Sequence, residues 1–129
     1  MSKIPQSGLQ LQSMVTSSGQ LQLTLREVAV APPRENEVLV RVEASPINPS
    51  DLGLLLGMAD LSTATPVGNG DLPAVTADIP PALVKHMSGR FDESMPVGNE
   101  GAGVVIAAGA DPQAQALLGR TVAVRRRRL

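Results

Sequence analysis

Alternation of hydrophobic and polar residues marks the strands most clearly near the beginning of the chain. Leucine occupies every second position of residues 9–11 and again of residues 21–25, and a Ser-Ser-Gly turn lies between the two stretches. A period of two on both sides of a glycine-containing turn predicts a β-hairpin with one buried face. Two prolines at 32–33 would end its pairing, because proline lacks the backbone donor. Residues 37–43, Glu-Val-Leu-Val-Arg-Val-Glu, predict a further strand, since they alternate and are rich in β-branched side chains.

A short helix is expected after the turn Ala-Ser-Pro-Ile-Asn-Pro-Ser-Asp that follows this strand. Ser50 or Asp51 would cap its first turn, because their side-chain oxygens accept backbone N–H groups that lack a partner there. Gly57 would end it, since glycine adopts the left-handed conformation common after a helix.

The next part of the chain shows no hydrophobic period. Residues 58–80 are rich in Pro, Gly, Asn, Thr and Asp and predict a long loop, and we expect residues 58–94 as a whole to form an inserted loop segment. Within it, only residues 81–88 are expected to form a brief helix. Long loops inside compact domains are usually functional or mobile.

The last third returns to strand signals. Residues 96–109 form a glycine-punctuated turn that leads into an apolar strand, and residues 111–118 predict a turn or a helical piece. Residues 119–124 predict the last strand. Many short strands, Gly and Pro turns and few helices favour a mainly β fold, either a barrel or a sandwich.

Composition and charge narrow the functional classes. The chain has 129 residues, a net charge of −1, no cysteine and one aromatic residue, a phenylalanine. The length fits one domain. Without cysteine there is no disulfide, thiolate nucleophile or cysteine-ligated zinc. Without aromatic faces for base stacking, binding of single-stranded nucleic acid is disfavoured. No apolar run approaches the length of a membrane helix, so we expect a soluble, cytoplasmic protein without a membrane partner. For the reason of base stacking given by the aromatic content, no nucleic-acid partner is expected either.

The basic residues are unevenly distributed. Arg125, Arg126, Arg127 and Arg128 stand together at the end, and the rest of the chain has seven basic against twelve acidic residues. Such a run can bind phosphate groups electrostatically. Because it follows a buried-type strand abruptly, we interpret residues 125–129 as a basic tail that results from truncation or a shifted reading frame; a functional tail and a simple solvated end are the alternatives.

Three glycines, Gly98, Gly101 and Gly103, raise the question of a phosphate-binding loop. The dinucleotide fingerprint is Gly-x-Gly-x-x-Gly between a strand and a helix. Here the order is Gly-x-x-Gly-x-Gly, and strand-like residues follow. We therefore expect these glycines to serve backbone geometry, as sites of bending or of close approach by another strand.

Other candidate chemical groups have simpler interpretations. His86 is the only histidine, and a catalytic triad or a metal site needs partners that the chain lacks, so a solvated or structural role is favoured. Asp92, Glu93 and Glu100 could be paired carboxylates, but nothing in their spacing demands it, and surface charge is the expected role.

Two stretches together carry a family resemblance. Residues 37–51 and 95–109, with Glu-Val-Leu-Val-Arg-Val-Glu-Ala-Ser-Pro-Ile-Asn-Pro-Ser-Asp in the first and Met-Pro-Val-Gly-Asn-Glu-Gly-Ala-Gly-Val-Val in the second, resemble the N-terminal GroES-like domain of the medium-chain dehydrogenase/reductase superfamily. The resemblance implies a partly open β-barrel with short helices over residues 1–124, with the loop insertion at 58–94. The Rossmann domain of that superfamily is not expected within this sequence.

Two amides distinguish the branch that the chain resembles. Zinc-dependent members of the superfamily have a cysteine ligand at the position of Asn48 and a histidine ligand at that of Asn99, and amides are poor zinc ligands. The resemblance is therefore to the zinc-independent quinone oxidoreductases and enoyl reductases, and no metal site is expected. It implies hydride transfer from NADPH or NADH to a quinone or an activated alkene (an enone or an enoyl thioester), with Asn48 beside the nicotinamide and Asp51 capping the next helix.

The resemblance has two gaps. Relatives of this type carry a tyrosine in the region where this chain has Gly53 and Ala59, and the chain has no tyrosine, so no catalytic residue is identified. The Rossmann domain supplies nearly all cofactor contacts, so the chain alone is expected to be an inactive fragment that binds neither NADPH nor NADH tightly. A homodimer is expected only in a full-length form. The alternative is a GroES-like binding or scaffold module without enzymatic activity, because a fold does not fix a function.

Overall fold

The chain forms two compact units, each built from segments that are distant in sequence. The computed structural model describes residues 4–68 and 70–125. Within them, unit 1 comprises residues 4–8, 29–46 and 98–125, and unit 2 comprises residues 9–28 and 47–97. The strands are β1 (Ser7–Val15), β2 (Gln20–Ala29), β3 (Val38–Ala44), β4 (Asp60–Gly68), β5 (Pro73–Asp78), β6 (Met95–Pro96), β7 (Glu100–Ala108) and β8 (Thr121–Arg125). The helices are α1 (Pro49–Leu55), α2 (Pro81–Val84), the 3-10 helix η1 (Lys85–Arg90) and α3 (Pro112–Gln115).

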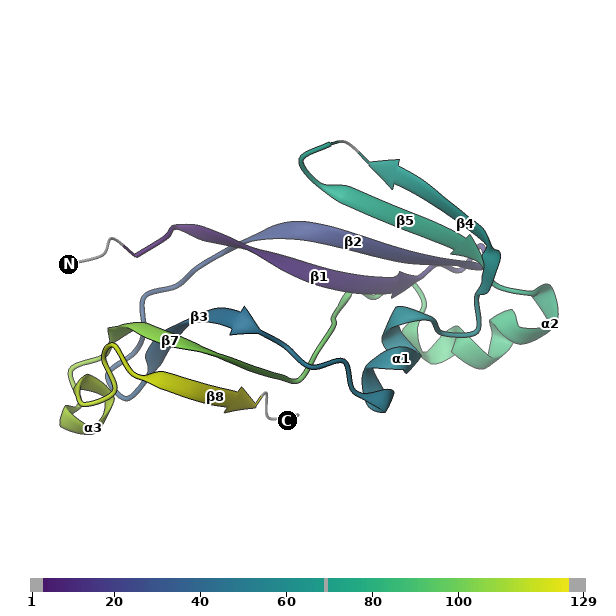
Figure 1. Ribbon diagram of the computed structural model, residues 1–129. Helices are drawn as coiled ribbons and strands as arrows, with labels where there is room; N and C mark the ends of the chain where they lie inside the picture. Colours follow the sequence, from purple (N-terminus) through teal and green to yellow (C-terminus); the bar gives the residue numbers. More distant parts are fainter. Residues whose placement is uncertain (1–3, 69, 126–129) are drawn as a thin grey trace. The chain divides into compact units, whose positions relative to one another are not determined.

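The predicted mainly β fold with short helices is confirmed. A five-stranded sheet has the order β4-β5-β2-β1-β6, and a three-stranded sheet has the order β3-β7-β8 (Figure 1). The pairs with a defined register between these strands are antiparallel. Within the described residues each sheet ends in two edge strands, so neither sheet closes into a barrel by itself.

The predicted hairpin forms from β1 and β2, but only part of the face that was expected to be buried is covered. At the tip, Gly19 has φ +93 and donates its N–H to the carbonyl of Thr16 at 3.0 Å. Leu9 and Leu11, expected inside, are 62% and 38% exposed. Ser13 is instead fully buried. The hydrophobic core of unit 2 lies at the tip end of β1, so only the last residues of that strand are covered.

That core contains Val15, Leu21 and Ile79, all almost completely buried. Against them pack five partly buried side chains, namely Ala59, Leu83, Val84, Met87 and Phe91. Three of the five come from α2 and η1, which occupy residues 81–90. The brief helix predicted at 81–88 is therefore confirmed, and it covers the core of unit 2.

The loop predicted at 58–80 is wrong. Residues 60–78 form a hairpin of β4 and β5, and β5 pairs with β2 from Gln20↔Asp78 to Thr24↔Ala74 (Figure 1, teal). The alternating pattern is missing because β4 is exposed along almost its whole length. A strand with no buried face has no need of a hydrophobic period. Threonine and valine in the segment still favour extended backbone.

In unit 1 the strands expected at 37–43, in the second part of 96–109 and at 119–124 are present as β3, β7 and β8. Strand β7 is central, paired with β3 on one side and β8 on the other. The helical piece expected at 111–118 is α3, whose N-cap Asp111 accepts the N–H of Gln113 at 2.7 Å.

Close packing of the backbone explains two glycines of unit 1. A Cβ at Gly103 would overlap the carbonyl of Arg41 in β3 and stand 2.9 Å from the Cα of Val42. A Cβ at Gly109 would overlap the carbonyls of Arg34 and Glu35. The expected geometric role of glycine in this part of the chain is thereby confirmed for Gly103, and Gly109 serves the same purpose at the end of the strand.

Candidate functional site

The turn before α1 positions the first predicted site residue. Asn48 is the N-cap, with extended backbone (φ −91, ψ 155), and Pro49 is the first helical residue. The expectation that Ser50 or Asp51 would be the cap is wrong. Proline is favoured at the first helical position, and the residue before it is driven to extended backbone, so Pro49 fixes the cap one residue earlier.

Asp51 is not the N-cap, but it holds this turn in shape. It lies at the third helical position, and its Oδ2 accepts the backbone N–H of Asn48 at 2.8 Å. That contact is half of a capping box, in which side chains satisfy backbone donors at the start of a helix. The Asp51 side chain is 3% exposed, and its other oxygen, Oδ1, is buried without a hydrogen-bond partner.

The other end of α1 is tied to β1 by a buried hydroxyl. Ser13 donates its Oγ–H to the carbonyl of Leu54 at 2.6 Å, and Arg90 donates from Nη2 to the same Oγ at 2.8 Å. The carbonyls of the last helical turn lack hydrogen-bond partners inside the helix, and Ser13 supplies a donor to one of them. Helix α1 is thus held by side-chain hydrogen bonds at both ends.

The charged guanidinium of Arg90 is partly buried. Burial lowers the pKa of its guanidinium, because loss of water disfavours the charged form. Its Nε is buried without a hydrogen-bond partner. Within residues 4–68 and 70–125, the ion pairs join Arg34 to Glu37 and Arg41 to Glu43, and Arg90 is held by its hydrogen bond to Ser13.

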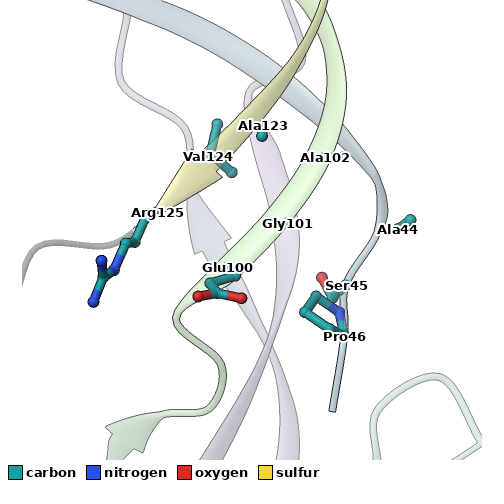
Figure 2. Close-up of a pocket in the computed structure, with 9 residues that line it drawn as sticks. All are labelled: Ala44, Ser45, Pro46, Glu100, Gly101, Ala102, Ala123, Val124 and Arg125. Carbon is teal, nitrogen blue, oxygen red and sulfur yellow. The ribbon is translucent and has the colours of Figure 1, made fainter. Parts of the chain in front are cut away.

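A hollow of about 370 Å³ lies in unit 1 beside the start of β7 (Figure 2). Its lining residues come from the end of β3 and the following turn, the start of β7 and the end of β8: Ala44, Ser45, Pro46, Glu100, Gly101, Ala102, Ala123, Val124 and Arg125. The hollow exists because these side chains are mostly small. A Cβ at Gly101 would come within 3.2 Å of both the Ala44 carbonyl and the Val42 side chain.

The two predicted amides belong to different units. Asn48 lies in unit 2, and Asn99, directly before the lining residue Glu100, lies in unit 1. The glycines from Gly98 onward lead into β7 rather than into a helix, as expected for a geometric role. The role of Asn48 beside a nicotinamide stays a prediction.

The remaining candidates do not gather into one chemical site. His86 is exposed on η1. Asp92 has a structural function, since its Oδ1 accepts the N–H of Ser17 at 3.2 Å and its own N–H bonds the carbonyl of Val15 at 2.8 Å. Glu93 is exposed in the same unit as Asp92, whereas Glu100 belongs to the other unit. Of the basic tail expected at 125–129, Arg125 is instead the last residue of β8, and residues 126–129 lie outside the described residues. Across the described ranges, no group of three or more His, Cys, Asp or Glu residues could hold a metal ion.

Sequence reasoning missed Ser13 and Arg90. The signal for Ser13 was available: it occupies the position of the alternating series where the next leucine would stand, so it shares that face of β1. A polar residue on a face expected to be buried calls for a hydrogen-bond partner. Nothing in the local sequence marks Arg90, because its partner is 77 positions away.

Comparisons with known proteins do not name a family. No model of a known protein family matches the chain, and no curated protein matches it either. In the described part of the chain, no helix has the length and apolar character needed to cross a bilayer. The interpretation of function therefore depends on the residues and geometry given above.

Proposed function

We propose that this chain is the GroES-like domain of a zinc-independent, NAD(P)H-dependent oxidoreductase that reduces quinones or activated alkenes. One observation carries the proposal. The two sequence stretches with the family pattern are distant in the chain, yet their strands β3 and β7 are direct antiparallel partners, from Val38↔Ala108 to Ala44↔Ala102. Both stretches also contribute walls to the same hollow (Figure 2).

The donor set determines which chemistry is proposed. Asn48 and Asn99 offer amides, which bind zinc poorly, so the proposed reaction uses a substrate that is already activated by conjugation. NADPH or NADH supplies the hydride when bound. The task of this domain is to orient the substrate and to stabilise charge that develops on its oxygen. Asn48 suits such a task, because Asp51 and Pro49 fix its backbone.

In this proposal, substrate orientation and cofactor binding belong to two different domains. No Gly-x-Gly-x-x-Gly occurs in the sequence, and no described glycine lies between a strand and a long helix in the way that cradles a pyrophosphate. We therefore assign most cofactor contacts to a nucleotide-binding domain outside these 129 residues. A cytoplasmic location, in keeping with the lack of cysteine, is part of the same proposal.

The decisive experiment reads the gene beyond the codon for Val124 in all three frames and titrates the purified chain with NADPH. We expect a Gly-x-Gly-x-x-Gly sequence between a predicted strand and helix, and no saturable change in NADPH fluorescence on adding the chain. The cofactor's own fluorescence is the signal, since the chain has neither tryptophan nor tyrosine. A gene without the fingerprint in any frame overturns the family assignment. Stoichiometric NADPH binding by the chain alone overturns the assignment of the cofactor contacts to another domain.

A further inference from the structure

The edges of the two sheets are protected unequally. An edge strand presents unpaired backbone groups that another strand can join, and proteins block such pairing with proline, bulges or very short strands. Strand β4 contains Pro66 and an irregular register between Asp60 and Thr65. Strand β6 is two residues long and ends in Pro96. Strand β3 has two register shifts against β7.

Strand β8 has none of these devices. It runs Thr-Val-Ala-Val-Arg, with no proline or glycine, and pairs with β7 in unbroken register from Val104↔Thr121 to Glu100↔Arg125. It stands at the outer position of the sheet β3-β7-β8 (Figure 1, yellow). Among the described edge strands, β8 is the one ready to accept a further strand.

We propose that β8 pairs antiparallel with β8 of a second copy of this chain, with Ala123 on the two-fold axis. In that register Val122 faces Val124 of the second copy, and Thr121 faces Arg125 of the second copy. The five residues are thus complementary to themselves when reversed, as a two-fold interface requires. The pairing would join two three-stranded sheets into one sheet of six strands.

The exposure and charge of β8 favour this arrangement. Val122 and Val124 are only partly buried in one copy, so cross-strand contact between them would remove apolar surface from water. Charge selects the antiparallel direction. Arg125 ends β8, and parallel strands would place the two copies of Arg125 side by side, whereas antiparallel strands place each of them opposite Thr121. The proposal departs from the expectation that a homodimer forms only in a full-length protein, because the edge strand that it uses lies within this chain.

Charge substitutions at position 121 test the register directly. The purified chain is measured by analytical ultracentrifugation over concentrations from about 10 µM to 1 mM, a range suited to weak association. We expect a reversible dimer. Thr121→Glu places a carboxylate opposite arginine twice in each dimer, and we expect its Kd to fall on the order of two- to thirtyfold. Thr121→Lys places like charges together and should raise the Kd by a similar factor.

A charge-reversal double variant tests whether the dimer can be restored, and substitutions in β4 serve as the control. Thr121→Lys combined with Arg125→Glu restores opposite charges across the axis and should return the Kd toward that of the unchanged chain. Thr65→Lys and Thr65→Glu, at an exposed position of the protected strand β4, should leave the Kd unchanged. Far-UV circular dichroism identifies any variant that fails to fold; if Thr121→Lys does so, the comparison rests on Thr121→Glu.

Several results would overturn the proposal. These are a chain that stays monomeric over the whole concentration range, a dimer whose Kd ignores the charge at position 121, or Glu and Lys variants that shift the Kd in the same direction. A dimer that responds equally to the substitutions at Thr65 would also exclude β8 as the specific contact.

Discussion

Replacing Gly103 by alanine should be among the most damaging single-methyl changes available in unit 1. The added Cβ would overlap the carbonyl oxygen of Arg41 and stand 2.7 Å from the carbonyl carbon of the same residue. Carbon atoms in favourable contact are about 3.5–4.0 Å apart. The neighbouring strand would therefore have to move by at least roughly 0.8 Å, and the atoms that must move belong to its backbone, which cannot rotate away as a side chain can.

The cost follows from where this overlap lies. Gly103 sits in the middle of β7 and pairs with Val42 of β3. Separating the strands locally weakens about two ladder hydrogen bonds, each worth about 1 kcal/mol, and overpacking itself costs about 1–3 kcal/mol. We expect Gly103→Ala to lower the free energy of unfolding by about 3 kcal/mol, a large share of the 5–15 kcal/mol typical of a folded domain.

Urea unfolding followed by far-UV circular dichroism measures this effect, since the chain has no tryptophan or tyrosine for fluorescence. With a slope of about 1–3 kcal/mol per molar urea, the midpoint should fall by about 1–3 M. Gly8→Ala is the matched control in the same unit, because its Cβ would make only an ordinary contact at 3.7 Å with Val30. If Gly103→Ala unfolds within about 0.5 kcal/mol of the unchanged protein, the close approach of β3 and β7 is not as described.

Two further predictions concern polar contacts. Ser13→Ala leaves the Leu54 carbonyl and the Arg90 guanidinium without their shared partner, and the free energy of unfolding should fall by about 1–3 kcal/mol in the same urea assay; an unchanged midpoint would contradict the bonding described at β1. The pKa of the exposed Asp60 is lowered from 3.8, mainly by the hydroxyl and then the N–H of Ser62, so its carboxylate form is favoured in the folded state and the benefit is lost as pH falls through the lowered pKa. NMR titration should give a midpoint below 3.8 that rises in Ser62→Ala, and a midpoint that stays fixed in that variant would exclude the hydroxyl as the cause.

The sequence predicts strands well where hydrophobic and polar residues alternate and poorly where they do not. Residues 37–43 and 119–124 alternate and predict strands, although β3 contains no fully buried residue. The hairpin of β4 and β5 is exposed and carries no periodic signal, so its strands are not predicted. Its turn signal was nevertheless visible, since Gly68 and Gly70 stand between Thr- and Val-containing stretches, and Gly68 adopts φ +89.

Burial could be predicted less well than secondary structure. Alternation shows which side chains share a face, but not how far along the strand the core extends. Leu9 shares a face with Val15, yet it is 62% exposed while Val15 is fully buried. The covering residues, such as Ile79 and Phe91, are more than sixty positions away in the chain, and local sequence cannot place them.

Some features of the candidate site can likewise be predicted from local sequence, and others cannot. The cap at Asn48 follows from local rules, because a proline at the next position sets both residues. The link from Ser13 to Arg90 does not, since it spans 77 positions. The hollow beside β7 likewise needs three segments that meet only after folding.

The order of the three-stranded sheet affects how the protein is made. Strand β3 ends at Ala44, but its partner β7 begins only at Glu100. During translation the valine-rich β3 therefore leaves the ribosome more than fifty residues ahead of its partner. Throughout that interval its apolar side chains and backbone groups are open to capture by chaperones or by other nascent chains. The yield of soluble protein in cells should consequently depend on the rate at which residues 45–100 are synthesised.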